Sequence, residues 1–260
     1  MRIACFDSGI GGLTVLHEAM KRLPHEHFLY YADTLHVPYG TKSKEDVMRH
    51  VNEAVAAIVQ EEVKALIVAC NTATSIAISQ LRQTYSIPII GMEPAVKPAL
   101  DLNRTTGKRV LVLATPLTLK QSKFKDLIAR LDDQSIVDSL PLPELVHYCE
   151  QLNFDRSFMS NYFHTKLSSY PLQHVGTVVL GCTHYPFYTN ILREILPSHI
   201  DIVDGSAGTV SRLVQILEHE GPVSCSLQKD GYDRVDFRCS SQDQAYIHKM
   251  ETALHILRNQ

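Results

Sequence analysis

The chain has 260 residues, a net charge of −3 and 45% hydrophobic residues, values typical of a globular protein with one large domain or two ordinary ones. The slightly acidic balance argues against the basic surface that binds nucleic acid. No apolar run approaches the roughly 18 residues of a membrane span, and we expect no signal peptide. Six cysteines without a CxxC pair favour free thiols in a reducing cytoplasm over disulfides or structural zinc.

The first part of the chain alternates between predicted strands and helices. Residues 2–7 are expected to form the first strand, and a glycine-rich turn follows over 8–12, whose amides would suit an anionic group. A second strand is expected over 27–33, followed by a loop over 34–43. Ser43 should cap the next helix, which carries an apolar stripe at helical spacing.

A third strand, residues 65–69, ends at Cys70, where a helix over 73–85 is expected to begin shortly afterwards. A fourth strand is predicted over 87–90. Residues 93–98 then mark a boundary, because their two prolines should break any helix that starts there.

Beyond this boundary the alternation restarts. Such repeated β-α units predict an α/β fold with parallel sheets covered by helices on both faces, here formed twice. The expected strands are 109–114, 135–140, 175–180 and 200–203 as the last parallel strand, with 234–239 as an edge strand; the expected helices are 118–131, 209–217 and 242–257.

Two cysteines occupy matching positions in the two halves of the chain. Cys70 follows one apolar strand within ACNT, and Cys182 follows another within GCTH. In an open α/β sheet, the carboxyl ends of the strands form the ligand-binding edge. A lone cysteine is usually an inert core residue, but two matched cysteines beside hydrogen-bonding side chains favour a chemical role.

Three chemistries use cysteine in this way. Cys182 with His184 could act as a nucleophile and its base, but Cys70 would then have no role. A redox pair would normally be near in sequence, as in CxxC. Two thiols acting as general acid and general base on opposite faces of one carbon would use both cysteines. On residue type alone, Asp7 could be either a helix cap or a functional carboxylate.

Four motifs in this order resemble the glutamate racemases of the Asp/Glu racemase superfamily. They are DSGIGG at 7–12, PYG and KS within 38–43, ACNTATS at 69–75 and GCTHYP at 181–186. The resemblance implies two similar parallel-sheet α/β domains that face each other across a central active-site cleft. It places residues 1–95 and a returning segment, 205–260, in the first domain, and residues 96–204 in the second.

The resemblance also implies a cytoplasmic isomerase that interconverts L- and D-glutamate without a cofactor or a metal. The product would supply peptidoglycan synthesis. Glutamate would be the small-molecule partner, no nucleic acid or membrane would be bound, and a homodimer is possible. An aspartate or broader amino-acid racemase is the alternative enzyme, and a protein that binds without catalysis is a third reading.

By resemblance, Cys70 and Cys182 are the two bases. Asp7 would assist Cys70, while His184 and Glu150 would assist Cys182. One thiolate would remove the Cα proton, and the other thiol would deliver a proton to the opposite face.

The assignment of Glu150 rests on the weak pattern PELVHYCE, in which Glu144 competes and Cys149 is expected only to pack. Further positions match those that hold the substrate's carboxylates and ammonium in the family. They are Asp7, Ser8, Tyr39, Gly40, Asn71, Thr72, Thr115, Thr118, Thr183 and His184.

Overall fold

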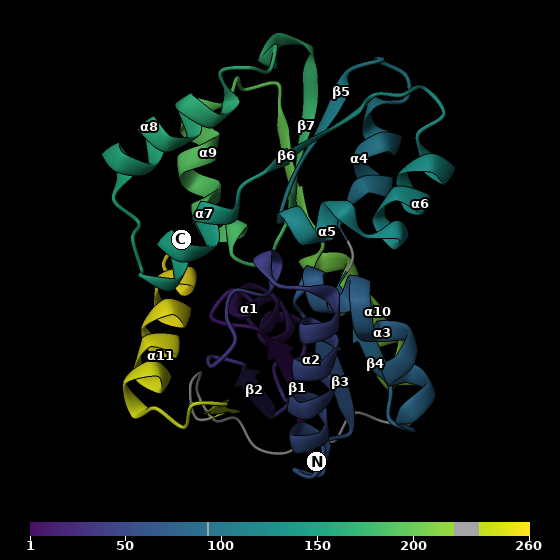
Figure 1. The fold of residues 1–260 in the computed structure, drawn as a ribbon, viewed down its shortest axis with the longest axis vertical. Helices are drawn as coiled ribbons and strands as arrows, with labels where there is room; N and C mark the ends of the chain where they lie inside the picture. The colour runs from purple at the N-terminus through teal and green to yellow at the C-terminus, as the bar shows by residue number, and fades with distance from the viewer. Residues whose placement is uncertain (93, 221–233) are drawn as a thin grey trace.

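Two parallel sheets, one above the other, organise the chain (Figure 1). The computed structural model describes residues 1–92, 94–220 and 234–260. Sheet A has the strand order β4-β3-β1-β2-β9, and all of its strand pairs are parallel. Its strands are β1 (Ile3–Asp7), β2 (Phe28–Ala32), β3 (Ala65–Val68), β4 (Ile89–Gly91) and β9 (Val235–Cys239).

Helices cover both faces of sheet A because successive side chains of each strand point to opposite faces. Ile3 and Cys5 of β1 pack in the core that α1, α10 and α11 complete, whereas Ala4 and Phe6 pack in the core that α2 and α3 complete. These helices are α1 (Leu13–Arg22), α2 (Lys44–Val59), α3 (Asn71–Thr84), α10 (Ser206–Glu220) and α11 (Gln244–Arg258).

Sheet B has the strand order β6-β5-β7-β8, again with parallel pairs only. Leu111 and Leu113 of β5 share the core that also contains Cys5 of sheet A, so the apolar interior is continuous between the sheets. The strands are β5 (Arg109–Ala114), β6 (Val137–Pro141), β7 (Val175–Gly181) and β8 (Asp201–Asp204). The helices are α4 (Val96–Asn103), α5 (Pro116–Lys120), α6 (Ser122–Leu131), α7 (Pro143–Glu150), α8 (Arg156–Leu167) and α9 (Thr189–Ile195), and 3-10 turns cover Tyr39–Thr41, Leu172–His174 and Tyr185–Tyr188.

The predicted fold class, α/β with two parallel sheets, is confirmed. The chain crosses from sheet A to sheet B after β4 and returns after β8, where Arg22 of α1 donates to the Ser211 hydroxyl of α10 at 2.6 Å. The domain bounds 1–95 with 205–260, and 96–204, stay a prediction. Figure 1 shows α11, in yellow, rising beside the lower sheet toward α7 of the upper part.

Four details of the predicted elements differ from the structure. The proline-rich boundary contains a helix, α4, because Pro98 is its third residue, where a backbone N–H has no intrahelical partner. The single helix expected over 118–131 is two helices separated at Gln121, whose backbone is extended. Residues 200–203 are not the last parallel strand, since β9 pairs parallel with β2. Helices α8 and α9 were not predicted.

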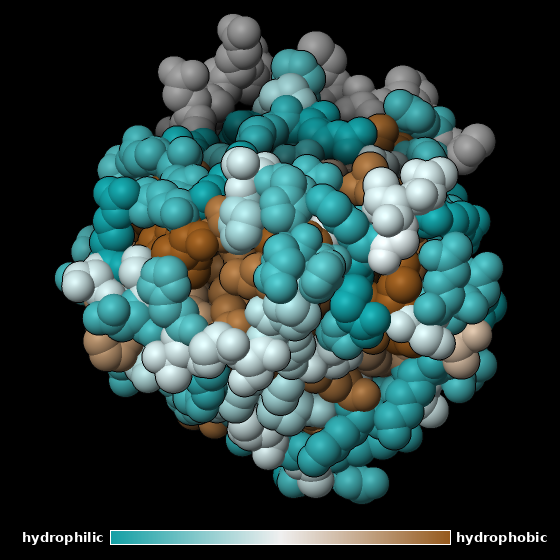
Figure 2. Space-filling view, turned by 90° about the horizontal axis from the view of Figure 1, so that it is seen from above, coloured by the Kyte–Doolittle hydropathy of each residue, from teal (hydrophilic) through white to brown (hydrophobic). Residues whose placement is uncertain are grey.

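Some predictions fall on positions that the structure does not describe, namely Glu93, Cys225 and the first part of residues 222–240, for which the sequence predicts a less regular segment. Within the described ranges, no helix combines the length and the apolar character that crossing a bilayer requires. Figure 2 looks down on the end of the molecule that carries sheet B, and there hydrophobic side chains lie chiefly in hollows between hydrophilic ones.

Ser43 caps α2 as predicted, with its hydroxyl accepting from the backbone N–H of Asp46 at 3.1 Å. We expect Ser43→Ala to lower the free energy of unfolding by about 1 kcal/mol, because a helix N–H loses its acceptor. Ser43→Asn retains a capping oxygen and should stay within a few tenths of a kcal/mol of the wild type. Urea denaturation of the three proteins measures this, and equal losses in both variants would contradict the capping role.

Candidate active site

Both matched cysteines lie where a strand of their sheet gives way to a helical segment. Cys70 is the N-cap of α3, and its sulfur accepts from the Ala73 N–H at 3.5 Å. Cys182 directly follows β7. Although they belong to different sheets, both thiols line the same small cavity and are nearly buried, at 6% and 7% exposure.

The cavity collects most of the residues predicted to hold substrate. All of them except Asp7 and Thr118 line it, and Pro38 and Val146 are additional walls that the sequence did not indicate. The space is narrow: about 10 Å³ is open to the centre of a water molecule, close to the minimum that one water needs. An amino acid the size of the glutamate that the resemblance implies can therefore enter only if the walls move apart.

Three threonine hydroxyls link the two sheets at one side of the cavity. Thr72 of α3 lies 3.0 Å from both Thr115 and Thr118, which are 2.9 Å from each other. Thr115 is also the N-cap of α5, accepting from the Thr118 N–H. Thr118 does not line the cavity itself, but its hydroxyl contacts those of Thr72 and Thr115, which do.

Asp7 also links the two sheets. Its carboxylate accepts from the Gly9 N–H and, across the sheets, from the Thr183 hydroxyl, both at 3.0 Å. Burial raises the pKa of Asp7, while the positive charge of His184 and these hydrogen bonds oppose the rise. The carboxylate is fully buried yet hydrogen-bonded, and Asp7 is not the N-cap of α1, since that position is Gly12.

Cys70 is poised as a thiol. Burial and the nearby negative charge of Asp7 raise its pKa, and the donors Ala73 N–H and Ser8, whose hydroxyl oxygen lies 3.9 Å from the sulfur, oppose this only partly. A thiol of raised pKa holds its proton at neutral pH and can deliver it.

Cys182 stands next to a buried ion pair. Its sulfur lies 3.7 Å from Nδ1 of His184, and Nε2 of His184 lies 2.8 Å from Oε1 of Glu150. Burial opposes protonation of His184, but its hydrogen bonds to Cys182 and Glu150 hold the pKa of the imidazole well above its usual range. His184 is therefore positively charged at neutral pH, with Glu150 as its counter-ion.

Glu150 is itself held by the turn after β1 and by α11. Its carboxylate accepts from the Ile10 N–H at 2.8 Å, the Tyr246 hydroxyl at 2.6 Å and the Lys249 ammonium at 3.3 Å. Burial alone would raise the pKa of Glu150, but the hydrogen bond and charge of His184, with the other donors, lower it to about 2. The carboxylate is ionised throughout the neutral range.

The competing glutamate lies elsewhere. Glu144 pairs with the Lys166 ammonium at 2.9 Å and accepts from the Tyr162 hydroxyl at 3.3 Å, contacts that belong to α7 and α8 outside the cavity. Cys149 is fully buried among apolar side chains of the core, a position that suits the packing role expected of it.

Sequence reasoning missed Tyr246 and Lys249. Tyr246 is partly core, since its ring packs against the central cluster, but its hydroxyl serves Glu150, which is 96 residues away in the chain. A contact at this separation leaves no local pattern in a single sequence.

The glycines of the first turn explain how these groups approach so closely. A Cβ on Gly9 would stand 1.9 Å from Oε1 of Glu150, and one on Gly11 would stand 2.4 Å from Nδ1 of His184. Any side chain at either position would displace the ion pair. The absence of side chains at Gly9 and Gly11 therefore lets Glu150 and His184 pack directly against the backbone of this turn.

Comparison with known proteins points to one family. The family model described as Asp/Glu/Hydantoin racemase matches residues 13–213. The glutamate racemase of Halothermothrix orenii is 52% identical over 85% of this chain and 87% of its own length, and glutamate racemase 2 of Bacillus subtilis is 48% identical over 91% of each.

Among solved structures, the Escherichia coli glutamate racemase in complex with L-glutamate and the activator UDP-MurNAc-ala superposes with a TM-score of 0.84 and 31% identity. The match covers 98% of this chain and 94% of that one. With its matched cysteines in one cavity and its sequence related over most of its length, the chain belongs to the Asp/Glu/hydantoin racemase family.

Proposed function

We propose that this protein is an isomerase that interconverts L- and D-glutamate with Cys70 and Cys182 as the two acid/base groups. The observation that carries the proposal is that two thiols, each from the end of a strand in a different sheet, line one cavity. Groups on two sides of a cavity can reach opposite faces of one carbon. The relatives named glutamate racemase, 52% and 48% identical, favour glutamate as the substrate.

The proposed reaction inverts Cα in two proton transfers. The thiolate of one cysteine takes the Cα proton, the electron pair stays on the substrate carbon, and the thiol of the other cysteine donates its proton to the opposite face. Cys70 is held as a thiol by burial. Cys182 can pass its proton to and from His184, whose positive form Glu150 stabilises at 2.8 Å.

Polar groups around the thiols suit an amino acid with two carboxylates. Asn71 has a buried side-chain oxygen that lacks a hydrogen-bond partner in the described structure, and it can accept from the substrate ammonium. Hydroxyl groups can donate to the carboxylates. They come from Ser8, Thr72, Thr115 and Thr183 at the cavity wall and from Thr118 behind it, and Tyr39 and Gly40 complete the wall.

Several further statements belong to this proposal. Two working thiols must stay reduced, which favours the cytoplasm, and D-glutamate made there would supply peptidoglycan synthesis. The proposed chemistry needs no cofactor or metal. An aspartate or broader racemase uses the same thiols and remains the alternative substrate reading. The homodimer implied by the resemblance stays a prediction that sedimentation analysis would decide.

The first test is incubation of the purified protein with L-glutamate in D2O, with EDTA present and pyridoxal phosphate absent. We expect optical rotation to be lost and deuterium to appear at Cα by NMR, because each inversion replaces the Cα proton by one from a thiol that exchanges with solvent. Protonated, optically pure glutamate would contradict the proposal. Activity with L-aspartate alone would keep the two thiols and change the substrate.

Removal of either cavity thiol should stop racemisation. We expect Cys70→Ala and Cys182→Ala each to lower kcat by about 10³-fold or more, since in each variant one face of Cα lacks its acid or base. Cys239→Ala is the matched control, because Cys239 is also buried but lies on β9 at the edge of sheet A. Substantial turnover in either cavity variant would rule out the two-thiol mechanism.

The charge of Glu150 should set the pH range of activity. Because Glu150 helps to raise the pKa of His184, Glu150→Gln should lower the pKa of His184, so that its positive form is lost at lower pH. The alkaline limb of kcat/KM against pH should then move to lower pH, with kcat reduced about tenfold or more. Glu144→Gln, which alters the carboxylate outside the cavity, should keep the wild-type profile; identical profiles for all three proteins would contradict this role.

A further inference from the structure

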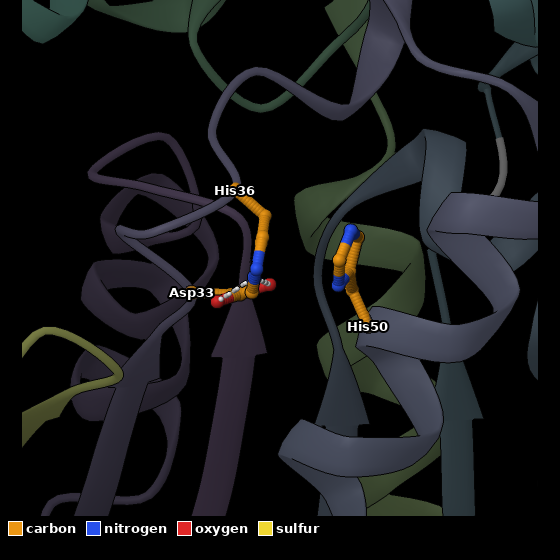
Figure 3. A group of neighbouring side chains, drawn as sticks. All are labelled: Asp33, His36 and His50. Atoms are coloured by element: carbon orange, nitrogen blue, oxygen red, sulfur yellow. Dashed lines mark hydrogen bonds and ion pairs between the residues drawn. The ribbon is translucent and has the colours of Figure 1, made fainter.

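A cluster of potential metal ligands lies beside the cavity but outside the proposed chemistry. Asp33 directly follows β2, His36 lies in the following loop, and His50 lies on α2, with their side chains converging as Figure 3 shows. One ligand atom from each lies within 4.8 Å of the others. Asp33 and His36 are three residues apart, and His50 follows 14 residues after His36 on the next helix, so only the fold brings its ring to the other two.

The cluster is built and largely enclosed. Asp33 and His50 are only 2% and 7% exposed, whereas the side chain of His36 is 30% exposed and opens the cluster to solvent. Nδ1 of His36 lies 2.9 Å from each carboxylate oxygen of Asp33. The rings of His36 and His50 stack with centroids 3.5 Å apart and planes 15° from parallel.

His50 provides an independent indication of a missing partner. Its Nδ1 is buried and has no hydrogen bond within the described structure, with Oε2 of Glu53 standing off at 3.8 Å. A buried polar atom without a partner is costly and requires an explanation. A metal ion bound at this nitrogen would supply the missing partner.

We propose that Asp33, His36 and His50 bind one divalent transition-metal ion of the zinc class. Two imidazoles and a carboxylate suit zinc, and three protein ligands leave a position for water or for Glu53. Zinc bonds of about 2.0–2.1 Å require ligand atoms about 3.3 Å apart, so the side chains must turn inward by a rotation that the partly exposed His36 can make. Tyr39 supports the site, because its hydroxyl donates to Asp33 at 2.6 Å and fixes the carboxylate.

The test must separate this site from the cavity thiols, because cysteine thiolates are good zinc ligands. The background is therefore the full chain with Cys70→Ala and Cys182→Ala, titrated with ZnCl2 by calorimetry. We expect one zinc per chain. Adding His50→Phe keeps a ring in the stack but removes its nitrogens, and His36→Gln removes the partly exposed ligand; each should weaken zinc binding about tenfold or more.

His248→Gln is the control for loss of a histidine, since the His248 side chain is 82% exposed and lies on α11, and it should leave zinc binding unchanged. Circular dichroism checks that each variant is folded; His36→Gln keeps the test valid if His50→Phe is not. Cobalt in place of zinc should give the absorption of nitrogen and oxygen ligands without thiolate bands. No binding in the background protein, or equal affinity in the histidine variants, would overturn the proposal and leave the cluster as a hydrogen-bond network only.

Discussion

The ion pair between His184 and Glu150 is the interaction on which the site's geometry depends. It joins the loop after β7 to α7 on the side of sheet B. Through Ile10, Tyr246 and Lys249, Glu150 is also bonded to the turn before α1 and to α11 on the side of sheet A. A buried pair of this kind is stable only when its remaining hydrogen-bonding capacity is satisfied. Here the carboxylate accepts from several donors, and the imidazole has the thiol of Cys182 on its other side.

This pair also gives the two thiols unlike surroundings. Cys70 has the anion Asp7 nearby and burial that favours its protonated form, whereas Cys182 has an imidazolium as its neighbour. Two chemically identical side chains thus have different surroundings, and in either direction of the proposed inversion one must act as a thiolate while the other acts as a thiol. The asymmetry comes from the residues around the cysteines, because the local motifs ACNT and GCTH are nearly alike.

The sequence predicted the fold class and most strands because apolar runs ending in small or polar residues are local signals. Ser43 as the cap of α2 was equally local. The misplaced features depend on distant contacts or on position within a helix. Pro98 reads as a breaker unless its place in the first turn of α4 is known, and Tyr246 reads as core unless Glu150 is seen beside it. The cluster of Asp33, His36 and His50 was missed for the same reason, since only the fold brings α2 against the end of β2.

The closed cavity has a consequence for affinity. The hydroxyls of Thr72 and Thr115 bind each other across the sheets, and Thr183 binds Asp7, so groups suited to holding a substrate are already satisfied by the protein. An arriving amino acid must break these contacts before it makes its own, and only the difference between the two sets contributes to binding. The protein's own hydrogen bonds thus compete with those that a substrate would make. Such self-competition keeps either enantiomer from being held too tightly to leave, which suits a reaction whose two directions must both proceed.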